Sequence, residues 1–261
     1  MSKGKARTIL LDHSASLVEG SAAGSSWGFL YQHSTVKHPG YNIGDRVALA
    51  DGRVFRYAYA DTARTTGYGM MFNALVAQGY TVLAAAQEIG DMSVTVVSAV
   101  DLAEDELRGG YIVMYTGDPN NTFRGIVGNS AVSATETVTI YLDAPLHIAV
   151  TITTGSEFFY NPYAHVAELA EDWLSVAGVS VTDIATAGYC WIQTWGLIRI
   201  SLHAKFGDDA GERQVVFGPN GDLRAHSAAG TANNYQHAGF IVDRTVIGTG
   251  SYALIMLQIS P

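Results

Sequence analysis

The sequence contains runs in which large apolar side chains alternate with other residues, and the clearest covers residues 188–196. A strand here places Tyr189 and Trp191 on one face, because successive side chains of a strand point to opposite sides. Cys190 and Ile192 then fall on the other face. A run of this kind, with two large aromatic rings and no reactive group on one side, indicates a building element of an all-β structural domain.

Other segments alternate in the same way and predict further strands. Arg46–Leu49 and Arg53–Tyr59 flank a turn at residues 50–52, which indicates a β-hairpin. We expect further strands at 93–98, 110–115, 123–127, 136–142, 146–152, 197–203, 239–242 and 252–259. The segment 63–79 predicts a short helix through Met70, Met71, Leu75 and Val76, and a second short helix is considered at Val166–Val176. No period of 20 to 50 residues repeats along the chain, which argues against a solenoid or a propeller.

These elements predict an all-β fold of two β-barrel-like or β-sandwich-like domains with an extended N-terminal arm. The arm is expected over residues 1–40, which are rich in Ser, Gly and Ala. The first domain covers 41–162 and ends at Asn161-Pro162, because proline cannot donate to a strand ladder. A connector covers 163–182, and a small C-terminal barrel-like domain covers 183–261.

The composition limits the classes of partner. Of the 261 residues, 15% are charged and 48% are hydrophobic, and the chain has 28 Gly and 14 Tyr. Charged residues are scarcer than in typical soluble domains, which indicates a surface that is covered by partners. The net charge is −9 and Lys and Arg are spread thinly. We therefore expect no nucleic-acid binding, since no basic stripe is available for phosphates.

The sequence pattern also argues against a membrane-spanning protein and against a protein stabilised by disulfides or by a multi-cysteine zinc site. No apolar run reaches the roughly 18 to 20 residues needed to span a bilayer, so we expect no membrane contact and a chain made in a cytoplasm. Cys190 is the single cysteine. This excludes an internal disulfide and a multi-cysteine zinc site, and stability must come from packing or assembly.

Residue types that are catalytic or bind metal in other proteins have a structural explanation in this sequence. Cys190 lies between two aromatics on a predicted buried strand, so we expect an inert core thiol. The turns at 117–121, 207–209 and 218–222 lack the spacing of a calcium loop, and Asp12, His13 and Ser14 are too close in sequence to form a hydrolase triad. His33, His38, His226 and His237 lack zinc-site spacing, and the glycines between Gly20 and Gly28 lack a phosphate-loop ending. We expect no catalytic residue, no metal and no cofactor, and hence no enzyme.

Four segments together resemble a family of tailed-bacteriophage virion structural proteins. They are Val47–Ala58, Gly109-Gly110-Tyr111, Asn161-Pro162-Tyr163 and Trp191–Gly196, and the resemblance covers most of residues 41–261. The stretch 206–234 and the segment near Met70 depart from the family pattern. The resemblance implies a β-rich particle component. The C-terminal part is similar to decoration, or cement, proteins of the capsid surface.

The expected function is therefore capsid decoration: binding to the major capsid protein on the outer surface of the head, as a homotrimer. We expect the protein to be made in the host cytoplasm and to be located on the capsid surface of the virion. The candidate interface anchors are aromatic, because aromatic residues are the usual hot spots of interfaces. They are Trp27, Phe29, Tyr31, Tyr57 and Tyr59. We expect that removing residues 1–40 leaves the β domains folded. The alternatives are another virion role, such as a tail, fibre or baseplate protein, a hydrolytic enzyme, and a carbohydrate-binding β module that uses exposed tyrosines such as Tyr57, Tyr59, Tyr68, Tyr160 and Tyr163.

Overall fold

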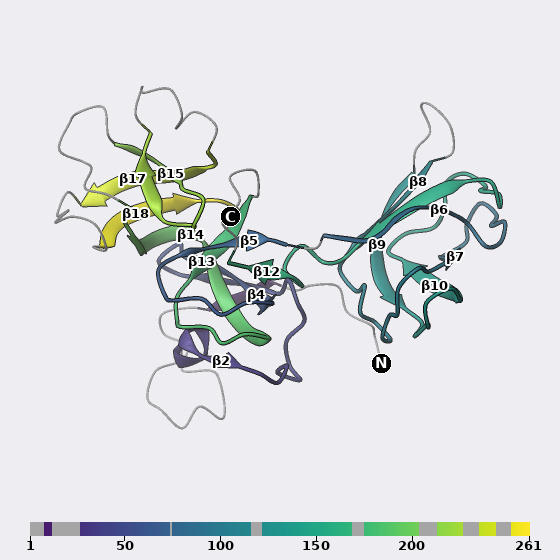
Figure 1. The fold of residues 1–261 in the computed structure, drawn as a ribbon, viewed down its shortest axis with the longest axis horizontal. Coiled ribbons are helices and arrows are strands. Elements are labelled where there is room, and N and C mark those ends of the chain that lie inside the picture. The colour runs from purple at the N-terminus through teal and green to yellow at the C-terminus, as the bar shows by residue number, and fades with distance from the viewer. Residues whose placement is uncertain are drawn as a thin grey trace. The chain divides into compact units, whose positions relative to one another are not determined.

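The fold is nearly all β, as the sequence predicts, and the strands form one 12-stranded and one 6-stranded sheet. The computed structural model describes residues 27–73, 75–115, 122–168, 175–203, 213–226, 235–243 and 252–261, together with the backbone of 8–11. These residues divide into two units (Figure 1). The inserted unit covers 75–162. The barrel unit is made from the residues before 74 and after 162.

The barrel unit contains a closed five-stranded barrel. Its strands follow the order β4 (Val54–Ala60), β12 (Val166–Ala167), β5 (Gly69–Phe72), β13 (Val176–Ser180) and β14 (Gly188–Ser201), and β14 pairs with β4 to close the ring. A barrel of so few strands has a narrow interior, so small side chains fill it. Ala58, Ala177 and Cys190 belong to this interior cluster and are each at most 1% exposed.

The long strand β14 leaves the barrel at Gly196 and continues into a second part of the 12-stranded sheet, which we call the curled sheet. Up to Trp195 it pairs with β4, and from Trp195 to Ser201 it pairs with β18 (Tyr252–Gln258). The curled sheet continues through β17 (His237–Asp243), β15 (Gln214–Phe217) and β16 (Leu223–Ala225). It curls until a bridge joins Leu202 to Leu223, and it encloses an apolar core of its own. The two predicted strands at 188–196 and 197–203 are thus one bent strand.

Three short strands of the same sheet and one 3-10 helix flank β4 and β14, and we call them the outer layer. The predicted hairpin is confirmed, with β3 (Arg46–Leu49) paired to β4. β1 (Thr8–Leu11) adds to β3 in parallel, and β2 (His33–Ser34) adds to β14. The 3-10 helix η1 (Gly28–Tyr31) precedes β2. Residues 27–40, which the sequence predicts as part of an extended arm, are therefore folded onto the barrel unit.

The inserted unit is a six-stranded sheet that curls around one core. The strand order is β6 (Val76–Val82), β11 (Gly155–Phe159), β8 (Tyr111–Tyr115), β9 (Thr122–Asn129), β10 (Thr137–Leu142) and β7 (Ser93–Val97). A bridge between Leu83 and Val96 joins the two ends of this order. The core contains Leu107, Met114 and Phe158, which are fully buried.

The helix predicted over 63–79 is wrong, because β5 and β6 occupy this segment. Met70 belongs to the barrel interior, whereas Met71 belongs to the core of the curled sheet. Two adjacent residues are buried because the strand has a core on each face, and this produces an apolar pattern that resembles a helix. The strand predicted at 146–152 is also wrong. Only one isolated bridge, between Val150 and Gln87, forms there.

The chain divides differently from the predicted domains. Residues 41–73 pair with strands from the second half of the sequence, so 41–162 is not one unit. The predicted connector 163–182 contributes β12 and β13 to the barrel. The helix considered at Val166–Val176 begins and ends in strands, and residues 169–174 within it lie outside the described part of the chain.

Candidate interaction surface

Aromatic rings from the segment before β3 cover the outer face of the barrel. Trp191 on β14 is 2% exposed and points outward, opposite to the interior Cys190. The ring of Phe29 lies 5.8 Å from that of Trp191 in an edge-to-face arrangement, and Tyr41 lies 5.2 Å from it. Leu30 is fully buried in the same cluster. This cluster fixes η1 on the barrel.

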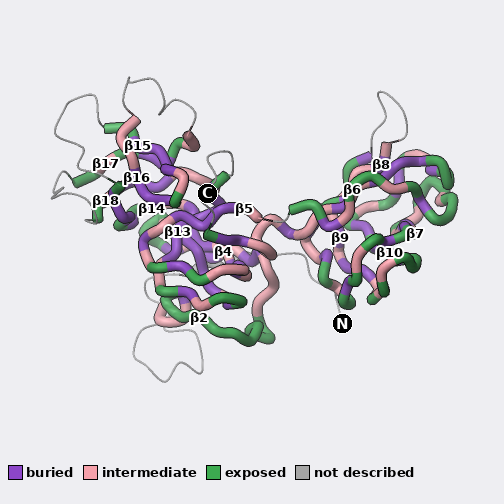
Figure 2. Tube along the Cα trace, in the orientation of Figure 1, coloured by how far each residue is buried: buried purple, intermediate pink, exposed green. Residues whose placement is uncertain are grey.

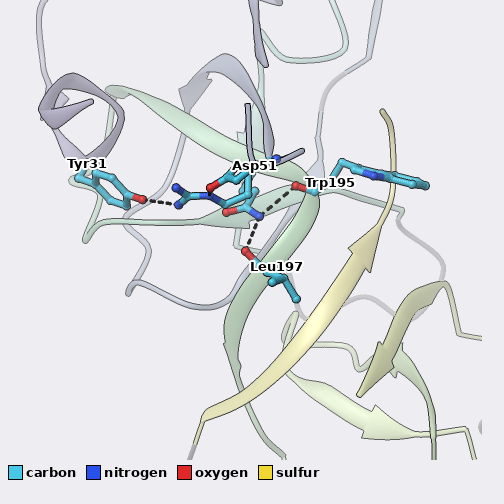
Figure 3. Close-up of polar contacts among 6 residues, drawn as sticks. Tyr31, Asp51, Trp195 and Leu197 are labelled. Carbon is cyan, nitrogen blue, oxygen red and sulfur yellow. Dashed lines mark hydrogen bonds and ion pairs between the residues drawn. The ribbon is translucent and has the colours of Figure 1, made fainter. Parts of the chain in front are cut away.

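Arg53 connects η1 to the turn between β3 and β4. Its guanidinium donates to the hydroxyl of Tyr31 at 2.8 Å and to the carboxylate of Asp51 at 2.7 Å (Figure 3). It also lies 5.5 Å from the ring centroid of Trp27. Figure 3 shows Tyr31 and Asp51 on either side of this contact, near the part of β14 that carries Trp195. The guanidinium thereby links η1 and the preceding Trp27 to the hairpin turn.

The five predicted anchors all lie around this layer, and most of their surface is used within the chain. Trp27 and Phe29 are partly buried against the aromatic cluster. Tyr57 is 3% exposed, so its ring is not an exposed platform for sugars. Tyr59 is partly buried with its ring 4.8 Å from that of Tyr189. Tyr31 is the most exposed of the five, at 44%.

The inserted unit carries most of the exposed large apolar side chains of the described residues. Such side chains mark interaction surfaces when they gather on one region. Figure 2 shows exposed segments along β6, whose outward residues are largely open to solvent. The exposed side chains of this unit are Leu75, Val76, Tyr80, Val82, Ile89, Met92, Val97, Tyr111, Phe123, Tyr141 and Ile152.

Three of these residues lie on two neighbouring loops and are 68%, 50% and 59% exposed: Ile89, Met92 and Ile152. We call the solvent-facing side of these loops the aliphatic loop surface. They belong to two loops that run side by side. Gln87 and Val150 form a bridge between the loops, and the amide of Gly90 donates to the carbonyl of Leu146 at 2.9 Å. The loops are therefore held to each other by backbone bonds while their aliphatic side chains face solvent.

Four aromatic side chains on the outward side of β6, β8 and β9 form what we call the aromatic face: Tyr80, Tyr111, Tyr115 and Phe123. The rings of Tyr111 and Phe123 are stacked, with centroids 5.1 Å apart and planes at 16°. The rings of Tyr80 and Tyr115 lie 6.1 Å apart with planes at 31°. Neighbouring residues such as Ile112 and Met114 point inward to the core, which leaves the aromatic rings on the solvent side.

A carboxylate lies within the aromatic face. Glu157 on β11 is paired in register with Val113, between the rows that hold Tyr111 and Tyr115. The hydroxyl of Tyr115 is hydrogen-bonded to Glu157, and this bond raises the pKa of Tyr115 above its ordinary value. The face therefore combines apolar rings with a carboxylate that accepts hydrogen bonds.

The inserted unit also holds almost all of the net negative charge of the chain. Residues 75–162 contain ten Asp and Glu residues, two Arg and no Lys, whereas the net charge of the whole chain is −9. Such an imbalance repels polyanions and attracts cationic partners, and it does not oppose neutral ones. The acidic character is thus a property of this unit rather than of the barrel unit.

The aromatic face is not among the sites predicted from the sequence, although part of its signal is visible there. Tyr111 and Tyr115 occupy alternate positions of a predicted strand, and Phe123 lies in the predicted partner strand. Alternation places them on one face but does not say which face is open to solvent. Tyr80 was missed because its segment was predicted as a helix.

Two histidine–aspartate pairs lie in the barrel unit. His165 Nδ1 is 3.1 Å from Asp61 Oδ1, and Asn73 donates to the same carboxylate at 2.9 Å. His203 Nδ1 is 2.8 Å from Asp222 Oδ2, in the predicted turn 218–222. Cys190 belongs to neither pair. It lies inside the barrel, where burial raises the pKa of its thiol to about 12.

The remaining candidates of the sequence analysis give no metal site in the described residues, where no group of three or more His, Cys, Asp or Glu side chains gathers. Three of them, Asp12-His13-Ser14 and the turns 117–121 and 207–209, lie outside these residues. In the same part of the chain, no helix has both the length and the apolar character to cross a bilayer.

Comparisons with known proteins identify no relative. No protein family, no curated protein and no solved structure matches the sequence or the fold of this chain.

Proposed function

We propose that the protein is a capsid decoration protein that binds the major capsid protein on the outer surface of a phage head. The resemblance of residues 41–261 to virion structural proteins supplies the biological setting. The observation that carries the adhesive role is the concentration of exposed apolar side chains on the inserted unit, among them Ile89 of the aliphatic loop surface, which is 68% exposed. The function that we propose for the protein is adhesion to the capsid rather than catalysis.

The physical basis of binding is burial of apolar area from water. Removing apolar surface from solvent is worth roughly 25 cal/mol per Å², and residues at the centre of an interface contribute most. Ile89 and Ile152 are more than half exposed and Met92 is half exposed, so each has apolar surface that a partner can bury. Each contact is weak, and repetition over a symmetric lattice, with the protein assembled as a homotrimer, multiplies it through avidity.

The experiment that tests this function uses phage heads that lack the protein. The purified chain is mixed with these heads, the particles are pelleted, and bound protein is measured and imaged by electron microscopy. Ordered density at symmetry positions of the outer shell is the expected result. Absence of the protein from the pellet and from the shell contradicts the proposal and leaves a tail, fibre or baseplate role as the next candidate.

Charge substitutions in the aliphatic loop surface sharpen this test. Ile89→Asp and Ile152→Asp place carboxylates where apolar burial is proposed, so both are expected to weaken binding to heads by at least about tenfold, equal to 1.4 kcal/mol. Val36→Asp is the matched control, because Val36 is 72% exposed but belongs to the barrel unit. Equal binding by all three variants excludes the loop surface as the adhesive site.

A further inference from the structure

We propose that the aromatic face of the inserted unit binds a neutral polysaccharide chain. The proposal goes beyond attachment to the capsid and concerns a different part of the unit from the aliphatic loop surface. Sugar rings present flat patches of C–H groups edged by hydroxyls. Aromatic rings stack on the flat patches, and nearby polar groups bond the hydroxyls.

The rings of Tyr111 and Phe123 together form one platform. Tyr111 and Phe123 are diagonal neighbours on β8 and β9, since Tyr111 pairs with Gly125 and Phe123 with Val113. Their planes differ by only 16°, and they are 39% and 57% exposed. Because the two rings are stacked, each covers part of the other, and the exposed remainder of the pair is a rigid apolar platform on which a sugar can stack.

Tyr80 is held in place although it is 66% exposed. The pairing of β6 with β11 is irregular between Ser156 and Phe158, and Tyr80 lies opposite this irregularity. Its ring covers Gly155 so closely that a Cβ atom there would lie 2.3 to 2.8 Å from the ring and hydroxyl of Tyr80. The missing side chain of Gly155 makes room for the ring, which is thereby ordered before any ligand arrives.

A polar group lies between the two platforms. Glu157 faces outward between the rows of Tyr111 and Tyr115, and its carboxylate already accepts the hydroxyl of Tyr115. An ionised carboxylate has about four acceptor sites, so it can accept further hydroxyl groups from a sugar. This arrangement places a hydrogen-bond acceptor where a chain stacked on both platforms would pass.

The spacing and charge define the ligand. Tyr111 and Tyr115 are four residues apart on one strand, which corresponds to about 13 Å. Two platforms at this distance match several sugar units of an extended chain rather than a monosaccharide. The acidic composition of the unit disfavours sulfated or uronic-acid polymers, because like charges repel. A neutral polysaccharide is therefore the occupant.

The test is affinity electrophoresis of the full-length chain in native gels that contain hydroxyethyl cellulose, xylan, mannan or dextran. We expect slower migration in at least one of these gels than in a gel without polymer. Tyr111→Ala and Phe123→Ala are each expected to weaken the retardation about threefold or more, and the double variant to abolish it. Phe240→Ala is the matched control, since Phe240 is 43% exposed on the barrel unit.

A second set of variants separates binding from folding. Glu157→Gln keeps the shape of the side chain but removes the charge, and Gly155→Ala displaces the ring of Tyr80 while leaving the other platform. Both are expected to weaken retardation, with unchanged far-UV circular dichroism. Migration unaffected by all four polymers overturns the proposal, and so does retardation that survives the double variant. Loss of head binding in the double variant, without any polymer binding, assigns the face to a protein partner and also overturns it.

Discussion

Cys190 and Ala58 lie directly opposite each other on β14 and β4, inside the closed barrel. Burial raises the pKa of the Cys190 thiol to about 12. A protonated thiol that is 1% exposed is a poor nucleophile. We expect no reaction of the native protein with a thiol reagent such as dithionitrobenzoate at pH 8, and one equivalent of reaction in denaturant. Rapid labelling of the native chain at this pH would contradict this assignment.

The same thiol makes stability depend on pH. In the unfolded chain it loses its proton near its ordinary pKa of about 8.5, whereas the native chain keeps the proton up to about pH 12. Between these values the native state binds more protons than the unfolded state, so the free energy of unfolding falls as pH rises, by about 1.4 kcal/mol per pH unit. Below pH 8 the contribution is constant.

Cys190→Ala removes this dependence, so the difference in unfolding free energy between wild type and variant should narrow from pH 9 to pH 11. Urea titrations at several pH values measure it. Cys190→Ser serves as a comparison and should lower the free energy of unfolding by about 1 to 3 kcal/mol at pH 7, because its hydroxyl would be buried in an apolar interior. A difference that stays constant with pH would show that the thiol ionises equally in both states.

Leu30 is expected to be important for the stability of the barrel unit. It is fully buried in the aromatic cluster, so Leu30→Ala should cost about 2 to 5 kcal/mol, measured by chemical denaturation. For the same reason, deleting residues 1–40 should destabilise the barrel unit, because the outer faces of Trp191 and Phe55 lose their cover. Val36→Ala, at a residue 72% exposed, is the control. An unchanged denaturation midpoint in the deletion variant would restore the view of a separate arm.

Gly196 should tolerate no side chain. Its φ is +93°, and a Cβ atom there would lie 2.9 Å from the Cα of Arg53 in the hairpin turn. Gly196→Ala is expected to cost at least about 1 to 3 kcal/mol from the backbone conformation alone. Gly79→Ala is the control, since nothing lies within 4 Å of its added atom. Thermal unfolding followed by circular dichroism compares them, and equal shifts would exclude the close approach.

The inserted unit should fold when it is expressed alone as residues 75–161. Its ends are adjacent, because the amide of Tyr160 donates to the carbonyl of Leu75 at 2.9 Å, and its core is formed entirely by its own residues. A cooperative thermal transition of the fragment is expected. A fragment that shows no cooperative unfolding and exposes its apolar core to a hydrophobic dye would show that the barrel unit is needed for its fold.

Local pattern predicted much of the fold, because strand alternation records which face is buried. The hairpin of β3 and β4 and the opposite directions of Trp191 and Cys190 follow from nearest-neighbour sequence alone. Barrel closure does not, since Tyr57 pairs with Trp191 from a distant part of the chain and no local signal specifies that partner. The helix error at Met70 and Met71 has the same origin: two cores, each distant in sequence, bury adjacent residues.

The interaction surface was predicted less well than the fold. Aromatic residue type led to Trp27, Phe29 and Tyr57, but these rings pack against the barrel itself. Whether an aromatic side chain is buried or exposed depends on which other residues pack against it. Tertiary structure therefore decides that Tyr57 is buried and that Phe123 is exposed. The glycine beneath Tyr80 carried no recognisable signal in the sequence.

The short distance between Leu75 and Tyr160 also bears on the order in which the chain assembles. The barrel must bring β5 and β12 together across roughly 90 intervening residues, and each doubling of a flexible loop costs about 0.6 kcal/mol in closure entropy. Once the inserted unit has folded, its two ends are joined by a hydrogen bond, and the effective loop shrinks to a few residues. Early folding of the insert thus lowers the entropic barrier to closing the barrel, so mutations in the insert core should slow barrel folding even though the two cores share no residue.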